Sequence, residues 1–275
     1  MILFVKGKCR ITAHFVGDSL DATWQSSIGF FKKLIKSILY LPEYFLLLLF
    51  CKKYVDNVYT NGEHLKNRLS NFGVKAKSVV SSTLKISDAV DKHFLIENNR
   101  KIKKLLFVGY LRPAKGVFEL LSAFKKIVDI ESDISLSIVG DGESSDELSK
   151  YVMELGLVDK VFFLGHIDSQ QKLKAIYQSH DLFCFPSRSE GSPRVIVEAM
   201  FFGLLVVSNR VGSLPFSFES REIFFTDDFS LNSLFNTIFK ALKADPEQRL
   251  SIKISALEKV KNNYSIEQFL DEVFS

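Results

Sequence analysis

The sequence contains few cysteines and little net charge. Both observations limit the kinds of protein that it can represent. Its 275 residues include three cysteines, Cys9, Cys51 and Cys184, which are odd in number, far apart and without metal-ligand spacing. A reduced, cytoplasmic setting is therefore the simplest expectation. The net charge of +4 is spread along the chain. It is too weak to indicate a nucleic-acid partner, although it is compatible with anionic ligands or an anionic membrane surface.

The chain also has no long uninterrupted apolar run and no evident signal peptide. Met1 opens on a strand-like stretch without a small-residue cleavage site. In residues 28–54 the longest apolar run is Tyr44–Cys51, far shorter than the roughly 20 residues of a membrane span. We expect two amphipathic helices joined near Pro42. Two interpretations stay open: these helices pack in a core, or they lie on the inner face of a membrane, with lysines at the headgroups and Phe and Leu in the interface.

From about residue 100, short β-rich runs alternate with helical periods. Strands that are apolar throughout, each followed by a helix, are typical of a parallel sheet covered on both faces. The pattern predicts an α/β doubly wound domain. The expected strands are 104–109, 134–140, 160–165, 181–186, 204–208 and 222–226, and the stretch 230–275 is expected to be helical.

The first 95 residues differ, because only about three strands are expected there, at 9–16, 55–59 and 76–82. A parallel half normally needs more strands to bury both faces, so this domain is expected to be incomplete. The polar stretch 97–104 is interpreted as a linker. The sequence therefore predicts two Rossmann-like domains, a partial one over 1–96 and a second over 97–262.

Unusual residues follow five successive strands of the second domain. In an open parallel sheet, ligands bind outside the carboxyl ends of the strands. Lys115 and Arg112 follow the first of these strands and could bind an anion there. Gly191 and Ser192 precede a helix whose free N–H groups also favour an anion. This edge suits a diphosphate, with the alternative that the basic side chains are ordinary solvated charges.

Two glutamates, Glu190 and Glu198, stand eight positions apart in "PSRSEGSPRVIVEAM". A carboxylate repels phosphate, so a sugar hydroxyl is its natural partner. We expect Glu198 to hold a ribose diol and Glu190 to accept from hydroxyls of a transferred sugar. The alternative is that Glu198 is an ordinary exposed helix residue.

In order and spacing, these motifs resemble the family-4 glycosyltransferases of the GT-B fold. The resemblance rests on "VGYLRPAKGVFELLSAF", "IVGDGE", "VFFLGHID" and "YQSHDLFCFPSRSEGSPRVIVEAMFFGLLVVSNRVGSLP", which include the E-x7-E pair. It implies a nucleotide-diphosphate-sugar donor bound by 97–262. It also implies a glycan or lipid-linked acceptor held by 1–96, a helix at 263–275 packing back on that domain, and transfer with retention and without metal. The product class would be surface polysaccharide or another glycoconjugate.

Carried over residue by residue, the resemblance implies roles for individual positions. Lys115 would contact the diphosphate, Glu198 the ribose and Glu190 the transferred sugar, while the backbone of Gly165 to Ile167 would flank the base. The catalytic candidates are Glu190, Lys115, Arg112 and His14. The full set of expected donor-binding residues is Gly109, Tyr110, Lys115, Gly140, Gly142, Gly165, His166, Ile167, Glu190, Gly191, Ser192, Arg194, Val195 and Glu198.

The chain departs from the family pattern at three places. Tyr110 stands where the family often has Arg, and Arg112 is the expected substitute. Ser213 and Phe216 stand where a second Gly and a Glu are usual. The chain begins several strands late, near "CRITAHFVGDSLDATW", so a truncated reading frame with a damaged acceptor site is one hypothesis.

Two alternatives to an active transferase stay open. One is a nucleotide-sugar-binding remnant, or a subunit that depends on a partner. The other is a nicotinamide-binding oxidoreductase, because "VGDGESSD" resembles a dinucleotide fingerprint. That fingerprint requires a third Gly near Ser145 and an acidic residue after the next strand, where Gly165 and His166 stand, so the oxidoreductase is disfavoured.

Overall fold

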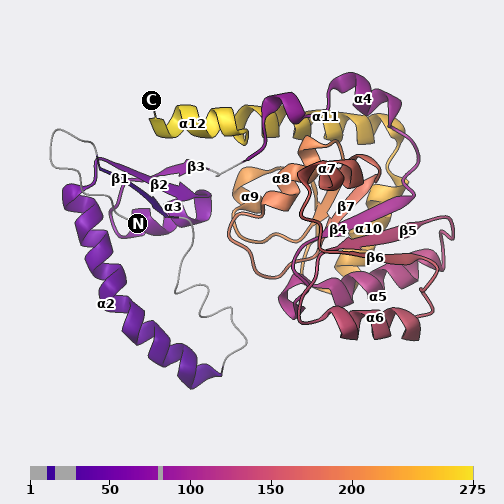
Figure 1. The fold of residues 1–275 in the computed structure, drawn as a ribbon, viewed down its shortest axis with the longest axis horizontal. Coiled ribbons are helices and arrows are strands. Elements are labelled where there is room, and N and C mark those ends of the chain that lie inside the picture. The colour runs from indigo at the N-terminus through magenta and orange to yellow at the C-terminus, as the bar shows by residue number, and fades with distance from the viewer. Residues whose placement is uncertain (1–10, 16–28, 80–82, 275) are drawn as a thin grey trace. The chain divides into compact units, whose positions relative to one another are not determined.

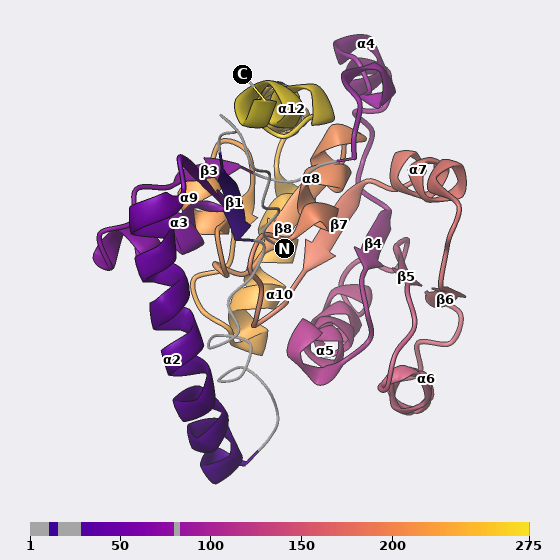
Figure 2. The ribbon, with the colours of Figure 1, turned by 60° about the vertical axis from the view of Figure 1, so that its left-hand side comes forward.

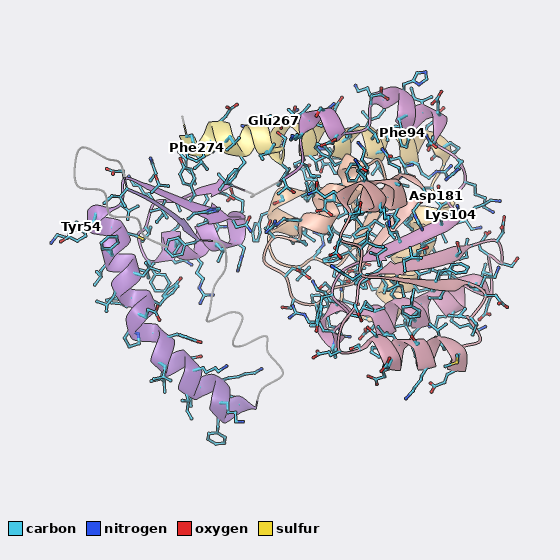
Figure 3. All side chains as sticks on the ribbon, in the orientation of Figure 1. Tyr54, Phe94, Lys104, Asp181, Glu267 and Phe274 are labelled. Carbon is cyan, nitrogen blue, oxygen red and sulfur yellow. The ribbon has the colours of Figure 1, made fainter. Side chains whose placement is uncertain are left out.

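The computed structural model describes residues 11–15, 29–79 and 83–274. Contacts divide the chain into two compact units, which are unit 1, Met1–Ser81 with Phe269–Ser275, and unit 2, Ser82–Gln268. The stretch 97–104, expected to be a linker, belongs to unit 2 and is bound there. Ile102 is buried, and the carboxylate of Asp181 accepts from the backbone N–H groups of Lys103 and Lys104 at 2.9 Å each (Figure 3). The polar composition of this stretch does not indicate the anchoring carboxylate, which comes from a residue far away in the sequence.

Unit 2 contains a six-stranded parallel sheet with the order β6-β5-β4-β7-β8-β9 (Figures 1 and 2). All six strands expected from the sequence are present, each slightly shorter than expected. They form because successive Leu, Val, Ile and Phe side chains can be buried on both faces of a parallel sheet. Their bounds are β4 Lys104–Val108, β5 Ser135–Val139, β6 Val161–Gly165, β7 Leu182–Phe185, β8 Leu205–Ser208 and β9 Phe224–Phe225.

Helices cover both faces of this sheet (Figure 2). Helices α5 (Val117–Val128), α6 (Ser145–Glu154) and α10 (Leu231–Lys243) lie on one face. Helices α7 (Gln170–Gln178), α8 (Arg194–Phe201) and α11 (Pro246–Asn263) lie on the other. The short elements are η1 Ile86–Asp88, α4 Lys92–Glu97, η2 Pro113–Lys115 and α9 Leu214–Ser217. The chain reverses its winding between β4 and β7, so the loops after these strands border the topological switch point.

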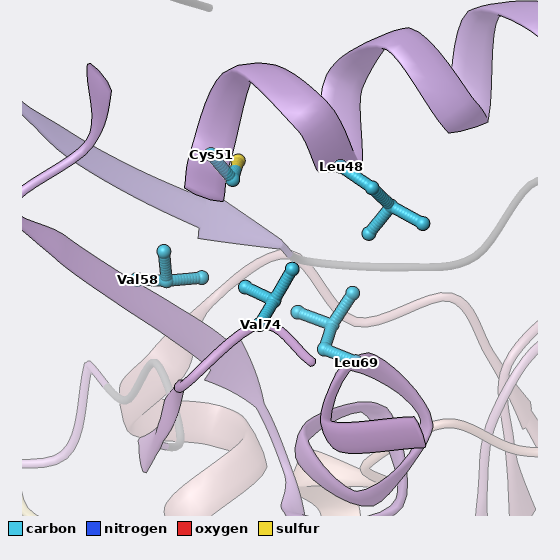
Figure 4. Close-up of a cluster of buried hydrophobic side chains, with 5 residues drawn as sticks. All are labelled: Leu48, Cys51, Val58, Leu69 and Val74. Carbon is cyan, nitrogen blue, oxygen red and sulfur yellow. The ribbon is translucent and has the colours of Figure 1, made fainter. Parts of the chain in front are cut away.

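Unit 1 contains a three-stranded parallel sheet of β1 (Thr12–Phe15), β2 (Asn57–Asn61) and β3 (Lys77–Val79) in that order. Expected strand residues 9–10, 16 and 80–82 lie outside the described residues. Helices α2 (Phe30–Tyr54) and α3 (Glu63–Asn71) pack beside the sheet. Their shared core consists of Leu48, Cys51, Val58, Leu69 and Val74 (Figure 4). Near the end of helix α12 (Ile266–Phe274), the Glu272 carbonyl accepts from the Tyr59 hydroxyl at 2.8 Å.

The expectation of two helices joined near Pro42 was wrong, because α2 is one continuous helix with Pro42 inside it. Proline removes one backbone N–H, which leaves the carbonyl four residues earlier without its helical donor. That residue, Ile38, is 58% exposed, so water can satisfy its carbonyl at little cost. As one helix, α2 is long and apolar enough, by length and composition only, to cross a membrane, with a mean hydropathy of 1.7.

Candidate functional site

The loops after β4 and β7 are locked together at the switch point. Gly116 has a φ of 71°, and a Cβ atom there would overlap the Pro186 carbonyl. The Arg188 N–H also donates to the Ala114 carbonyl at 2.9 Å. Glycine is required at 116 because only a residue without a side chain allows this approach in the left-handed region. The two loops therefore form one surface.

This surface carries an ion pair between Lys115 and Glu190. The Lys115 Nζ atom lies 2.5 Å from Oε1 of Glu190, and the two side chains are only 14% and 13% exposed. The Ser187 hydroxyl donates to the same carboxylate oxygen at 2.6 Å. The Lys115 ammonium also lies 5.5 Å from the centre of the Phe185 ring. The structure thus brings together two residues that the sequence assigned to one ligand, and here each is the partner of the other.

The buried side-chain amide of Asn209 fixes the loop after β7. The Nδ2 group of Asn209 donates to the carbonyls of Pro186 and Ser187 at 2.7 and 3.1 Å. Its Oδ1 atom accepts from the Thr226 hydroxyl at 2.8 Å. Asn209 and Thr226 are 4% and 1% exposed. The sequence analysis missed both residues, since only the end of the apolar run "VVSN" marks the position.

A cavity of about 810 Å³ opens at the ends of β4, β5 and β6. Two glycines shape it, because a Cβ atom at Gly140 would overlap the Gly109 carbonyl and one at Gly142 would overlap the Leu111 backbone. Six of the expected donor-binding residues line this cavity. The lining is Val108, Gly109, Tyr110, Val139, Gly140, Asp141, Gly142, His166, Ile167 and Leu173.

Glu198 lies in a different setting from the one expected of an exposed helix residue. Its Oε2 atom accepts a hydrogen bond of 2.9 Å from the hydroxyl of Tyr177, which is fully buried. Burial raises the pKa of Glu198, while the Tyr177 hydrogen bond and the charge of Arg194 act in the opposite direction. Burial, with the neighbouring Glu198 charge, holds the pKa of Tyr177 well above its usual value. Tyr177 was missed by the sequence analysis, although its position in "AIYQS" fits the buried face of a helix.

The Glu198 carboxylate lines a second cavity, of about 270 Å³, between α7, α8 and the segment that begins at Thr83. Lys174 and Asp88 also line it, with an ion-pair distance of 3.6 Å. Leu173 lines both cavities, so they are neighbours. Glu198 therefore lines one cavity, while Gly140 and Gly142 line the neighbouring, larger one.

The start of α8 has no side-chain cap and begins after Pro193. The loop before it is held by its own carbonyls, since Gly191 accepts from the Ser213 N–H at 2.8 Å. Ser213, which departs from the family pattern, thus contributes a backbone hydrogen bond to this loop. Of the remaining expected residues, Ser192 precedes this helix start, and Arg194 and Val195 are the first two residues of α8. N–H groups at a helix start without a side-chain cap can bind an anion.

Two expected site residues, Arg112 and His14, stand apart from the cavities, and a third, His166, lies at the rim of the larger one. Arg112 is exposed and forms no ion pair with a described residue. His166 pairs with Asp168 at 2.7 Å on the exposed rim, beside Gly165. His14 belongs to unit 1, where its ring centre lies 6.0 Å from that of Phe269 and burial lowers its pKa. Catalytic roles for Arg112 and His14 stay predictions.

Among residues 11–15, 29–79 and 83–274, no group of three or more His, Cys, Asp or Glu side chains could hold a metal ion. The expectation of a metal-independent site stays a prediction.

Comparisons with known proteins agree with this arrangement. The chain is 35% identical over 106 residues to an uncharacterized glycosyltransferase of Haemophilus influenzae, covering 38% of this chain and 29% of that protein. It is 35% identical over 124 residues to N-acetyl-alpha-D-glucosaminyl L-malate synthase of Bacillus anthracis, covering 45% and 31%. The chain thus spans about a third of the curated relatives it matches.

The fold is shared with solved glycosyltransferases of the GT-B type. The crystal structure of Anabaena HepE in complex with UDP-glucose superposes with a TM-score of 0.71 at 19% identity, covering 96% of this chain and 70% of that one. Residues 90–259 match the family Glycosyl transferases group 1. Because this match spans more than half of the sequence and includes both locked loops and the larger cavity, the chain belongs to the group 1 glycosyl transferases.

Proposed function

We propose that the protein binds a nucleotide-diphosphate-sugar in unit 2 and transfers the sugar to a glycan or lipid-linked acceptor. The transfer would proceed with retention and without metal, as in family 4 of the glycosyltransferases. The observation that carries the proposal is the Lys115–Glu190 pair at the switch point, beside a cavity large enough for a nucleotide. The UDP-glucose bound by the structurally similar Anabaena HepE supports this class of donor.

Each part of the donor finds a suitable chemical partner. The base would enter the larger cavity, near His166 and Ile167. The diphosphate would lie between Lys115 and the uncapped start of α8, because a cation and free backbone N–H groups both favour an anion. The ribose diol would donate to Glu198, whose second cavity adjoins the first. Glu190 would accept from hydroxyls of the transferred sugar.

Catalysis in this arrangement is electrostatic. As the bond from the anomeric carbon to the diphosphate breaks, negative charge grows on the leaving oxygen. Lys115 and the α8 start would stabilise that charge, because donor binding would set both of them against the diphosphate before the bond breaks. Lys115 must exchange its contact with Glu190 for the diphosphate, which also frees Glu190 for the sugar. The acceptor would be a precursor of surface polysaccharide or another glycoconjugate, and His14 and Arg112 stay further catalytic candidates.

Calorimetry with a panel of nucleotide-diphosphate-sugars tests the donor site. We expect Lys115→Met to weaken donor binding by about 10- to 100-fold, since a hydrogen bond to a charged group contributes about 1.5–3 kcal/mol. Lys125→Met is the matched control, because Lys125 pairs with Asp129 on the surface of α5. Equal donor affinities of K115M and the parent protein would refute the proposed diphosphate contact.

Donor binding without transfer is the second candidate function. It is favoured by the placement of every described cavity-lining donor residue in unit 2. Product analysis with labelled donor separates the two candidates. Binding with neither transfer nor donor hydrolysis would support the second one.

A further inference from the structure

Helix α2 carries an exposed apolar face in unit 1. Among the described residues, its contacts with the apolar core come from its last turns, through Leu48 and Cys51, with Tyr44 and Leu47 partly buried against them. From this end the helix extends beyond the β1–β3 sheet (Figure 1). Its exposed Phe, Leu and Ile side chains, each at least 40% exposed, are Phe30, Phe31, Leu34, Ile35, Ile38, Leu39, Leu41, Phe45, Leu46 and Leu49.

These side chains share one half of the helix surface. At about 100° per residue, all of them fall within half a turn around the helix axis. Lys32, Lys36 and Glu43 fall together on the opposite half. A long helix with one wide apolar face and a charged strip beside it is typical of helices that lie in a membrane interface.

The charges of α2 complement an anionic surface. Lys32, Lys33 and Lys36 lie in the first turns, and Lys52 and Lys53 lie in the last turn. Glu43 is the only acidic residue of the helix. Basic residues at both ends of an apolar face attract anionic headgroups, and this attraction weakens as salt is added.

The packing of the last turns of α2 favours a helix that lies on a membrane over one that spans it. The part of α2 before Tyr44 is about 21 Å long at 1.5 Å per residue, shorter than the roughly 30 Å hydrocarbon core. The rest of the helix is held by Leu48 and Cys51 in the core. We infer that α2 is an interfacial helix that docks unit 1 on an anionic bilayer, with its apolar half in the headgroup boundary. This inference does not depend on the proposed donor chemistry.

Co-sedimentation of the full chain with lipid vesicles tests the inference. The expected result is binding to vesicles that contain phosphatidylglycerol, weaker binding to phosphatidylcholine alone, and release by high salt. The double variant Leu39→Ser/Leu46→Ser removes side chains that are 69% and 67% exposed, so it should fold and bind vesicles at least 10-fold more weakly. Ile130→Ser/Met153→Ser is the control, since these unit 2 side chains are 56% and 61% exposed.

Three results would overturn the inference. The first is equal vesicle binding by the L39S/L46S and I130S/M153S variants. The second is vesicle binding that resists high salt and alkaline carbonate, which would indicate a membrane span. The third is an absence of vesicle binding together with a concentration-dependent dimer that L39S/L46S abolishes, which would assign the apolar face to a second copy of the chain. Calorimetry of donor binding on the same samples reports separately on unit 2.

Discussion

The ammonium of Lys115 and the carboxylate of Glu190 form an ion pair of 2.5 Å across the topological switch point of the unit 2 sheet. The residues are far apart in sequence, on the loops after β4 and β7, and both side chains are largely buried. Without a donor, each neutralises the other. A bound diphosphate and sugar would offer each of them a new partner, so the pair would couple ligand binding to the arrangement of both loops.

A double-mutant cycle on this pair measures the coupling. We expect Lys115→Met and Glu190→Gln each to lower the free energy of unfolding by about 1–3 kcal/mol, because each leaves a buried group without its charged partner. The double variant should lose less than the sum of the two, since neither charge is then left alone. Urea unfolding supplies the measurement, and additive losses would show that the pair is not coupled.

Glu198→Gln should change thermal stability and donor affinity in opposite directions. Burial raises the pKa of Glu198 in the folded state, so its ionised form costs stability above that pKa, and the cost disappears as the pH falls towards the ordinary carboxyl value of 4.5. Gln keeps an acceptor for the Tyr177 hydroxyl but carries no charge. We expect E198Q to melt higher than the parent at neutral pH, with the gap closing in acid, and to bind the donor more weakly.

The exposed Glu154 on α6 provides the control for that experiment, and Glu154→Gln should change neither quantity. A lower melting temperature of E198Q at neutral pH would contradict the assigned effect of burial. Unchanged donor affinity would remove Glu198 from the ribose site.

Thr226→Val should weaken donor binding although Thr226 lines neither cavity. The substitution keeps the shape of the side chain but removes the hydroxyl that donates to Asn209, at a cost of about 1–3 kcal/mol in unfolding free energy. Asn209 then holds the β7 loop less firmly, and Glu190 is displaced. Thr237→Val removes another buried hydroxyl, which donates to the Ser233 carbonyl within α10. It should cost stability with donor affinity intact, whereas equal donor affinity in both variants would rule out positioning through Asn209.

Lys253 should make the free energy of unfolding depend on pH in the alkaline range. Burial lowers its pKa from 10.5 to about 8, with the charges of Arg249 and Arg100 in the same direction and that of Asp181 opposed. Between pH 8 and 10.5 the unfolded chain binds more protons at this lysine than the folded chain, so its contribution to stability rises with pH. Lys253→Met should abolish this rise in urea unfolding, and Lys125→Met should retain it. An identical pH slope in the parent and K253M would refute the assignment.

Much of unit 2 was predictable from the sequence, for reasons of local chemistry. Apolar runs such as "KLLFV" can be satisfied only by a strand buried on both faces, and all six such runs became strands. The glycines of "VGDGE" predicted a tight loop at the correct edge of the sheet. Pro42 was interpreted as a helix break because its chemistry disfavours a helix interior, yet the exposure of Ile38 makes the lost hydrogen bond cheap.

The partners of the site residues were not predictable in this way. Tyr177 and Asn209 lie in stretches that are consistent with ordinary core packing, and only the folded chain brings them to Glu198 and to the β7 loop. The anchoring of 97–104 by Asp181 could not be predicted either, because only the folded chain brings these distant residues together. Hydrogen bonds between distant residues depend on strand order, which hydrophobic periodicity does not encode.

A parallel α/β domain after residue 100, with Gly, Lys and Glu residues at the carboxyl ends of its strands, can be inferred from the amino-acid pattern. Those features follow from burial and backbone chemistry over a few residues. The pairing of Lys115 with Glu190, the contact of Glu198 with the buried Tyr177, and the exposed apolar face of the single helix α2 arise only in the folded chain. Each of these depends on which surfaces meet after the strands have ordered, because charge, burial and solvent access are properties of the assembled fold.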